Sequence, residues 1–213
     1  MTKKAREFWN KHAKKYDNNE RQFEAVYKEI ISKTREHLRT SDEVLDFGCA
    51  TGTKTLELAG SVKRIHGLDL SDEMINEANR KKNELNILNA SFSQGTIFEN
   101  ELEDASFDKV ISYAVIHLLE ESEKVIQKIH SLLKPGGLFI ATTACLKDKM
   151  ALKNKLQFSA YLLIKRLGLF PLHLNMFAAS DVEQLISNAN FQLLQADKMF
   201  HGISIRYIVA KKQ

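Results

Sequence analysis

The sequence predicts an α/β fold in which helices alternate with the strands of a mostly parallel sheet, and three observations lead to that prediction. Short apolar runs at 43–47, 62–69, 90–93, 108–113 and 137–143 are typical of buried strands, and helical patterns separate them. The first run ends in a tight glycine-containing turn. The last two runs, 191–200 and 203–210, are joined only by His201-Gly202 and must pair as an antiparallel hairpin. One strand of the sheet therefore runs against the others.

Helical patterns connect these strands and extend the fold. Two amphipathic helices are expected at 3–17 and 20–38, and others at 53–60, 72–85 and 121–132, with Ser71 as the N-cap of the 72–85 helix. Residues 147–180 interrupt the alternation with an apolar helix over 150–167. Gly168 and Pro171 would end that helix before Ser180-Asp181 caps the next one.

Composition places the chain among ordinary folded proteins. Apolar residues make up 44% of the 213 residues and charged residues 27%, which is enough for a substantial core. The sequence has no run of about 18 apolar residues, the length that a membrane-spanning helix needs, and its first residues lack a signal-peptide pattern. We therefore expect a cytoplasmic location. The two cysteines do not suggest a disulfide framework, and the histidines show no metal-ligand spacing, so no metal is expected.

The segment after the first strand holds the clearest functional signal. Small residues at 48, 50 and 52 turn the chain tightly, and a glycine turn lets the backbone approach a ligand without a Cβ in the way. Asp69 closes the next strand beside that turn, where a carboxylate can accept two hydrogen bonds from a ribose diol. The pattern indicates an adenosine-binding site.

Three nucleotide-binding motifs compete for this loop, and residue spacing separates them. The dinucleotide fingerprint GxGxxG needs three glycines, of which only Gly48 is present. The phosphate-binding pattern GxxxxGK[ST] needs a lysine directly after its second glycine, but Gly52 and Lys54 are not adjacent. The third pattern, [DE]xGxGxG, begins at Asp46 and matches except at its middle glycine, where Ala50 stands.

With this third pattern the sequence resembles the class I S-adenosylmethionine-dependent methyltransferases. Later segments resemble the same family in order: 71–75 at the start of the second core helix, 94–97 in place of its Gly-Asp-Ala segment, 106–112 as its fourth strand and 132–140 as its turn into the fifth. Thr96 stands where the family usually has an Asp. The resemblance implies a Rossmann-like, doubly wound sheet of seven strands, mostly parallel, with one antiparallel strand at the C-terminal hairpin.

The resemblance also implies how the chain is organised. A single methyltransferase domain over 1–213 would comprise a helical cap (1–39), a cofactor-binding core (40–146), a helical lid insertion (147–180), and a helix with the hairpin (181–213). S-adenosylmethionine is the implied cofactor, and S-adenosylhomocysteine is its product. The insertion leaves the fifth strand at the carboxyl edge of the sheet, where α/β proteins bind ligands, so we expect it to cover the acceptor.

The resemblance assigns roles to individual residues. Asp46 and the loop would hold the methionine end, Asp69 the ribose, and Leu70 and Ile97 the adenine, while Ser112 and Tyr113 would lie beside the methionine amino group. The full set of predicted cofactor-binding residues is Tyr16, Asp46, Gly48, Cys49, Ala50, Gly52, Asp69, Leu70, Met74, Thr96, Ile97, Ser112 and Tyr113.

Two residues keep alternative interpretations. His117 follows the fourth strand and is either a base that removes a proton from a hydroxyl or amine acceptor, or a packing residue of a short helix. Tyr16 with Asp17 resembles a family segment that closes over the cofactor, and packing within its helix is the alternative. Methyl transfer from a sulfonium needs alignment and exclusion of water, so no enzyme nucleophile is expected.

Charge divides the sequence into three parts. Residues 1–39 carry 11 Lys/Arg against 6 Asp/Glu, residues 40–146 carry 10 against 17, and residues 147–166 carry 6 against 1. We expect the basic side chains of 147–166 to ring the mouth of the site and to favour a small anionic or amphiphilic acceptor. Transient contact with an anionic membrane surface is a related prediction, and a solvated lysine face is the alternative.

Two other functions compete with a small-molecule methyltransferase. A noncatalytic cofactor-binding subunit would have the same core and use the lid to bind a partner. The basic flanks also suggest a nucleic-acid methyltransferase, but the chain lacks a separate recognition domain. It also has Ser-Tyr-Ala-Val at 112–115 in place of the Asn/Asp-Pro-Pro-Tyr/Phe motif, so no specific nucleic acid is expected. The oligomeric state is left open.

Overall fold

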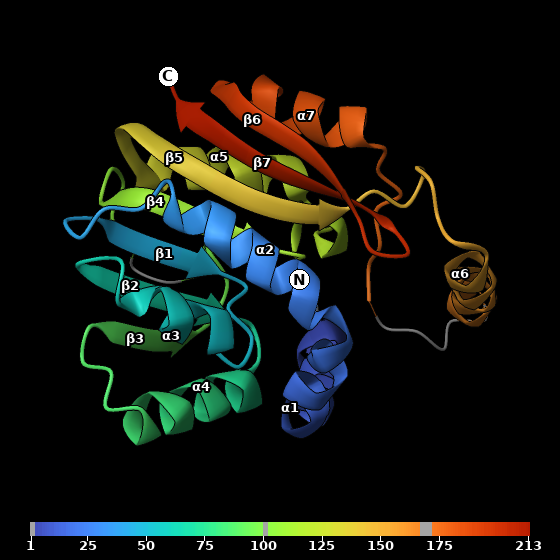
Figure 1. The fold of residues 1–213 in the computed structure, drawn as a ribbon, viewed down its shortest axis with the longest axis horizontal. Helices are drawn as coiled ribbons and strands as arrows, with labels where there is room; N and C mark the ends of the chain where they lie inside the picture. The colour runs from blue at the N-terminus through green and yellow to red at the C-terminus, as the bar shows by residue number, and fades with distance from the viewer. Residues whose placement is uncertain (1–2, 100–101, 167–171) are drawn as a thin grey trace.

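The structure, a computed structural model, describes residues 3–99, 102–166 and 172–213, apart from the side chains of 157 and 165. Within this part of the chain, seven strands form one sheet in the order β3-β2-β1-β4-β5-β7-β6 (Figure 1). The strands are β1 (Glu43–Phe47), β2 (Arg64–Asp69), β3 (Ala90–Gln94), β4 (Phe107–Tyr113), β5 (Leu133–Ala144), β6 (Phe191–Phe200) and β7 (Ser204–Lys212). The helices are α1 (Lys3–Glu20), α2 (Glu24–Arg35), α3 (Thr53–Ala59), α4 (Asp72–Glu84), α5 (Ser122–Leu132), α6 (Leu152–Arg166) and α7 (Ala179–Asn188), with short 3-10 turns η1 (Arg21–Phe23) and η2 (Ile116–Leu118).

The central strands are apolar on both faces because helices cover both faces. Neighbouring residues of one strand enter opposite cores: Leu45 packs into the core beneath α5 and α7, whereas Val44 packs into the core beneath α2 and α3. The same alternation holds at Val110 and Ile111. Successive side chains of a strand point to opposite faces, so a near-continuous apolar run is what a doubly covered parallel sheet requires.

The strand directions confirm the predicted mixed sheet. β1 pairs in parallel with β2 and β4, and β4 with β5, whereas β7 lies antiparallel to both β5 and β6. The reversed strand is therefore β7, and the hairpin predicted from the C-terminal runs is confirmed. Gly202 lies in the connection with a φ of +73°, a conformation that glycine adopts without strain.

Several element boundaries differ from those predicted. Helix α1 continues to Glu20, and the break before α2 falls at the 3-10 turn η1 rather than near residue 18. Strand β5 begins at Leu133, four residues earlier than expected, because Leu133 already pairs with Phe107. The predicted stops of the insertion helix, Gly168 and Pro171, lie outside the described residues.

The expected start of the last helix at Ser180-Asp181 is wrong by two residues. Ala178 occupies the N-cap position of α7, and its N–H donates to the Asp181 carboxylate at 3.0 Å. Asp181 thus acts from the third helical position by reaching back to the cap, whereas a side-chain cap acts from the N-cap itself.

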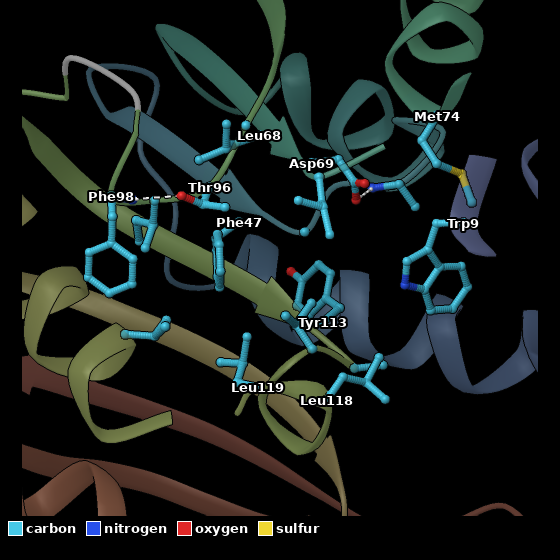
Figure 2. A pocket seen from close by; sticks show the side chains of 18 of the residues that line it. Trp9, Phe47, Leu68, Asp69, Met74, Thr96, Phe98, Tyr113, Leu118 and Leu119 are labelled. Atoms are coloured by element: carbon cyan, nitrogen blue, oxygen red, sulfur yellow. Dashed lines mark hydrogen bonds between the residues drawn. The ribbon is translucent and has the colours of Figure 1, made fainter. Parts of the chain in front are cut away.

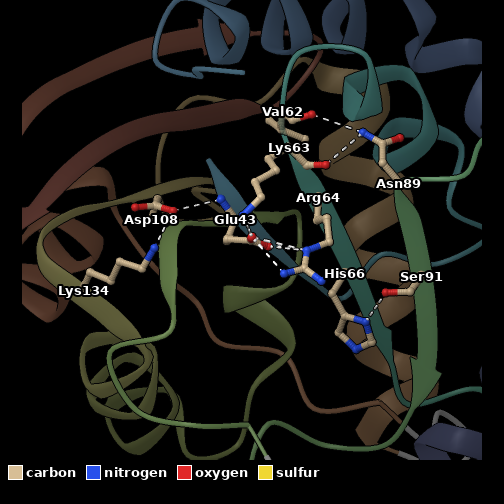
Figure 3. A network of polar contacts seen from close by, with 9 residues as sticks. All are labelled: Glu43, Val62, Lys63, Arg64, His66, Asn89, Ser91, Asp108 and Lys134. Atoms are coloured by element: carbon tan, nitrogen blue, oxygen red, sulfur yellow. Dashed lines mark hydrogen bonds and ion pairs between the residues drawn. The ribbon is translucent and has the colours of Figure 1, made fainter. Parts of the chain in front are cut away.

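A network of ion pairs closes the amino edge of the sheet, where β1 and β2 begin (Figure 3). Glu43 pairs with Arg64 at 3.0 Å and with Lys63 at 2.9 Å, and its backbone N–H donates to Asp108 at 2.9 Å. Lys134 completes the network by pairing with Asp108 at 2.8 Å. These charged groups pair with one another. The edge left available for a ligand is therefore the opposite, carboxyl edge of the sheet.

Helices α1 and α6 both lie beyond the carboxyl edge of the parallel strands (Figure 1). Helix α1 lies beside α4, whereas α6 stands farther out beyond the end of β5. No helix in the described ranges is both long enough and apolar enough to cross a bilayer.

Candidate functional site

The loop between β1 and α3 is held against the neighbouring strands by its backbone. The N–H groups of Gly48 and Cys49 both donate to the carbonyl of Leu68 on β2, at 2.8 and 3.2 Å. Gly48 has a φ of +79°, and a Cβ at this position would lie 2.3 Å from a methyl carbon of Val115. Only glycine fits there, because the conformation and the space both exclude a side chain.

Asp69 fixes the same loop from β2. Its carboxylate accepts hydrogen bonds from the backbone N–H groups of Ala50 and Ser71, each at 2.9 Å, while the side chain lines the adjoining cavity. Burial raises the pKa of the Asp69 carboxyl, and the backbone donors oppose that rise. A carboxylate with two oxygens still has acceptor capacity for the hydroxyls of a ribose.

A cavity of about 330 Å³ opens beside this loop. Figure 2 shows Trp9 and Met74 at one end and Phe98 at the other, with Asp69 and Tyr113 between them. Of the predicted cofactor residues, the cavity is lined by Tyr16, Gly48, Ala50, Asp69, Leu70, Met74, Thr96, Ile97 and Tyr113. The structure thus brings residues from α1, β2, β4 and the intervening loops to one cavity.

Four predicted cofactor residues lie behind the cavity wall. The Asp46 carboxylate is buried and accepts from the Thr55 hydroxyl at 2.5 Å, and burial raises its pKa to about 6. The Ser112 hydroxyl donates to the Phe47 carbonyl at 3.0 Å. Cys49 and Gly52 are buried residues of the loop itself. In this structure these four residues shape the loop and strand ends without lining the cavity.

Tyr113 lines the cavity and is also anchored behind it. Its hydroxyl donates to the Thr34 hydroxyl of α2 at 2.7 Å, on the other side of the sheet.

Helix α1 is fastened over the cavity by polar contacts at both of its ends. Near its start, both guanidinium-to-carboxylate contacts between Arg6 and Asp72 are 2.7 Å long. Near its end, Asp17 accepts from the Thr51 hydroxyl of the loop at 2.6 Å and pairs with Lys81 of α4 at 2.5 Å. The helix is thus held to the loop itself, which positions the Trp9 and Tyr16 rings as part of the cavity wall.

A second cavity of about 180 Å³ adjoins the first, and Ala114 lines both. His117 lines this second cavity and not the first. Its Nδ1 lies 3.2 Å from the Thr143 hydroxyl, and burial lowers the pKa of the imidazole to about 4. The ring is therefore neutral at pH 7 and can accept a proton but has none to donate as an acid.

Apolar side chains form most of the second cavity. Its wall includes Phe23, Val26, Ile30, Ile203 and Ile205. Polar groups are contributed by Glu20, Tyr27, Thr142 and Thr143, besides His117. The negative charge of Glu20 is balanced by Lys54, whose ammonium lies 2.9 Å from it and 3.7 Å from the centre of the Tyr27 ring.

The expected ring of basic side chains around the mouth is not formed, and this prediction is wrong. Neither cavity is lined by the described basic side chains of 147–166. Lys147 instead pairs with Asp181 at 2.8 Å, and Lys153 and Lys155 are exposed on α6. Helix α6 stands apart from the sheet, beyond the end of β5 (Figure 1).

Sequence reasoning missed Ala114 and the apolar rim of the first cavity. Ala114 has a φ of +59°, which is strained for a residue with a Cβ, and it marks the junction of the two cavities. Phe98, Leu118 and Leu119 also line the first cavity. Their position after the carboxyl ends of strands could have indicated that they lie near the site. No motif identifies an apolar loop residue as part of a binding cavity, however.

The first cavity fits the cofactor expected from the sequence. Its walls combine the Asp69 carboxylate with apolar surfaces from Leu70 and Ile97 and a glycine loop of close backbone approach. These are the groups that a ribose, an adenine and an amino-acid chain require. Three further acidic residues line the cavity: Glu99, Glu120 and Glu121. Within the described residues, no three His, Cys, Asp or Glu side chains gather where they could hold a metal ion.

Comparisons with known proteins agree with this geometry. A family profile described as "Methyltransferase domain" matches residues 38–165. The chain is 25% identical over 183 residues to a probable S-adenosylmethionine-dependent methyltransferase of Mycolicibacterium smegmatis, covering 86% of this chain and 65% of that protein. It is 28% identical over 148 residues to a demethylmenaquinone methyltransferase of Symbiobacterium thermophilum, covering 65% of this chain and 58% of that protein.

A solved structure supports the fold over nearly the whole chain. A putative methyltransferase of Haloferax volcanii, solved in complex with the Trm112 methyltransferase activator, superposes with a TM-score of 0.75 at 16% identity, covering 96% of this chain and 94% of that one. The chain spans about half to two thirds of the length of the curated relatives that it matches most strongly.

Proposed function

Because this chain belongs to the class I S-adenosylmethionine-dependent methyltransferases, we propose that it transfers a methyl group from S-adenosylmethionine to a small apolar or amphiphilic acceptor. The observation that carries the proposal is the pair of adjoining cavities that share Ala114. The first offers the groups that hold a nucleoside, and the second offers an apolar pocket at its far end.

Residues of the first cavity bind and orient the cofactor. Asp69 accepts the ribose hydroxyls, Leu70 and Ile97 flank the adenine, and the loop from Gly48 to Ala50 contacts the methionine end. Trp9 and Tyr16 of the cap exclude water from that end. When bound, S-adenosylmethionine supplies a methyl group on a sulfonium whose sulfur leaves as the neutral thioether of S-adenosylhomocysteine.

The second cavity determines the class of acceptor. Its volume of about 180 Å³ is close to that of an engineered apolar cavity of about 150 Å³ that holds benzene. The acceptor portion that enters is therefore an aromatic ring or a short alkyl group. A hydroxyl or amine on that group would face Ala114 and His117. One relative is named a demethylmenaquinone methyltransferase.

His117 handles the proton released at the acceptor. In the tautomer in which Nδ1–H donates to the Thr143 hydroxyl, Nε2 is the nitrogen that accepts. As the acceptor oxygen or nitrogen bonds to the methyl, its own proton becomes strongly acidic, and Nε2 takes that proton. An imidazole with a pKa of about 4 is a weak base, which suits a proton that leaves late in the step.

Calorimetry and turnover together test the proposal. S-adenosylmethionine and S-adenosylhomocysteine should bind, while NAD and ATP should not. Release of S-adenosylhomocysteine should then depend on phenolic, aromatic-amine or short-chain amphiphilic acceptors. His117→Gln should lower turnover about a hundredfold or more without changing cofactor affinity.

The matched control is His66→Gln. His66 also has its pKa lowered by burial and also contacts serine hydroxyls, but it lines neither cavity. Equal turnover in the two variants would refute the role of His117. Binding of the cofactor with no turnover on any acceptor of these classes would favour a noncatalytic cofactor-binding subunit.

A further inference from the structure

Helix α6 exposes a stripe of leucines on its outer face. Leu152, Leu156 and Leu163 are 75%, 65% and 61% exposed, respectively. At about 3.6 residues per turn, positions i, i+4 and i+11 fall on one face of a helix. Large apolar side chains scattered singly over a surface need no explanation, but three aligned on one face indicate a binding surface.

The opposite side of α6 is partly covered. Phe158 and Tyr161 are half-buried, and their rings stack with centroids 5.8 Å apart. The leucine stripe is the most exposed apolar face of the helix, and Leu162 and Ile164 on either side of it are also exposed, at 40% and 45%. A helix of a globular protein usually turns its apolar stripe toward the core. The outward orientation here therefore favours an apolar binding partner outside the protein.

Basic residues border the stripe. Residues 149–166 contain five Lys/Arg and no Asp or Glu. On a helical wheel, Lys153 falls on one side of the three leucines, and Lys155 and Arg166 fall on the other; all three are exposed. An apolar stripe flanked by cations is the pattern of a helix that lies in the interface of an anionic bilayer.

The tip of the β6–β7 hairpin is continuous with this surface. The N–H of Ala151 donates to the Gly202 carbonyl at 2.8 Å, which ties the start of α6 to the tip. Phe200 at the tip is 50% exposed, and the Lys149 ammonium lies 5.7 Å from the centre of its ring. The tip thus adds one more aromatic side chain and one more cation.

We propose that the outer face of α6, together with Phe200, docks on the surface of an anionic lipid bilayer. Charge selects this occupant over a second copy of the same face, because two such faces would bring cations against cations with no acid to offset them. Met150 and Ile203 form a bridge at the base of α6, and Ile203 also lines the second cavity. Docking would therefore place that cavity beside the lipid surface, from which an amphiphilic acceptor could enter.

Vesicle binding by the full chain tests the docking directly, and it needs no methyltransferase activity. The protein should sediment with vesicles of phosphatidylcholine mixed with phosphatidylglycerol, bind phosphatidylcholine alone far more weakly, and dissociate as salt is raised. Lys153→Gln with Lys155→Gln should lower the partition coefficient about 25-fold, at about fivefold for each cation near the surface. Leu156→Ala should lower it about tenfold.

Matched controls separate docking from general surface effects. Leu88→Ala makes the same change at a leucine that is 93% exposed just before β3, and Lys28→Gln with Lys63→Gln removes two exposed cations elsewhere. Both controls should bind as the wild type does. The thermal midpoint of the α6 variants should also be unchanged, because the altered side chains point to solvent.

Three results would overturn the proposal. The first is binding that is equal on neutral and anionic vesicles. The second is binding that the α6 substitutions leave unchanged. The third is a dimer in sedimentation equilibrium that Leu156→Ala splits, in protein that does not bind anionic vesicles, because the stripe would then be an interface between copies. A cofactor that binds normally while the vesicles do not would refute docking alone and leave the methyltransferase proposal intact.

Discussion

Replacing Gly48 by alanine tests whether the loop approaches the neighbouring strand as closely as the structure indicates. The new Cβ would lie 2.3 Å from a methyl carbon of Val115, and the backbone would keep a φ of +79°. Two separate costs arise, one from conformation and one from collision. We expect Gly48→Ala to lower both the free energy of unfolding and the affinity for S-adenosylmethionine, since Gly48 and Val115 both line the first cavity.

The conformational cost and the steric cost differ in magnitude, and only the steric cost can be relieved by a second substitution. A left-handed conformation costs a residue with a Cβ about 1–2 kcal/mol. Overpacking against a fixed neighbour costs about 1–3 kcal/mol more. Gly48→Ala should therefore destabilise by about 2–5 kcal/mol. Adding Val115→Ala removes the methyl that collides and should restore about 1–3 kcal/mol of that loss, but it leaves the conformational cost in place.

A double-mutant cycle measured by urea denaturation separates these effects. Gly60→Ala is the matched control, because Gly60 has a φ of −68° and a Cβ there would meet nothing within 4 Å. That change should be neutral or slightly stabilising. Additive effects of Gly48→Ala and Val115→Ala, within about 0.5 kcal/mol, would show that the two side chains do not meet and would refute the loop geometry.

Three further predictions concern the site. Asp69→Asn should weaken S-adenosylmethionine binding by about 1.5–3 kcal/mol in calorimetry, and an unchanged affinity would remove the ribose assignment. Ala50→Gly should keep cofactor affinity and raise the free energy of unfolding by about 0.5–1 kcal/mol, because Ala50 has a φ of +49°; Ala50→Val should abolish binding and destabilise the fold, and a Val variant with full affinity would count against this loop position. The folded-state pKa of His117, about 4, lies below its unfolded value of about 6.5, so its contribution is fully present above pH 6.5 and is lost as pH falls toward 4. Wild-type stability should therefore fall by up to about 3 kcal/mol relative to His117→Gln over that window, and parallel curves would refute the buried neutral imidazole.

The sheet could be predicted because its signals are local. An apolar run bounded by turn residues gives a strand wherever helices cover both faces, and a two-residue link can join two strands only as a hairpin. Asp69 and the loop at 48–52 were predictable for a related reason. The end of one parallel strand lies beside the end of the next, so their positions in sequence determine their proximity in space.

The parts of the site that the sequence left open depend on contacts distant in sequence. His117 was placed near the reacting methyl, but whether it lines the first or the second cavity depends on Ala114, which turns the chain with a positive φ that no motif announces. Asp46 matched a motif, yet its carboxylate is taken by Thr55 beneath the loop. A motif records which residue type occupies a position, whereas the direction of its side chain depends on neighbours that the motif does not include.

The charge division shows the same limit, because two segments of equal excess charge have different surroundings. In 1–39 the cations meet the acidic core: Arg6 pairs with Asp72 and Arg35 with Glu57. The exposed cations of α6 take part in none of the ion pairs found in the described part of the chain, since the helix projects beyond the core that carries the acids. The net charge of a segment therefore predicted that it attracts groups of opposite charge, but it did not predict which groups these are. For the cap, the partner is the protein's own core, and for α6 we propose that it is an anionic surface outside the chain.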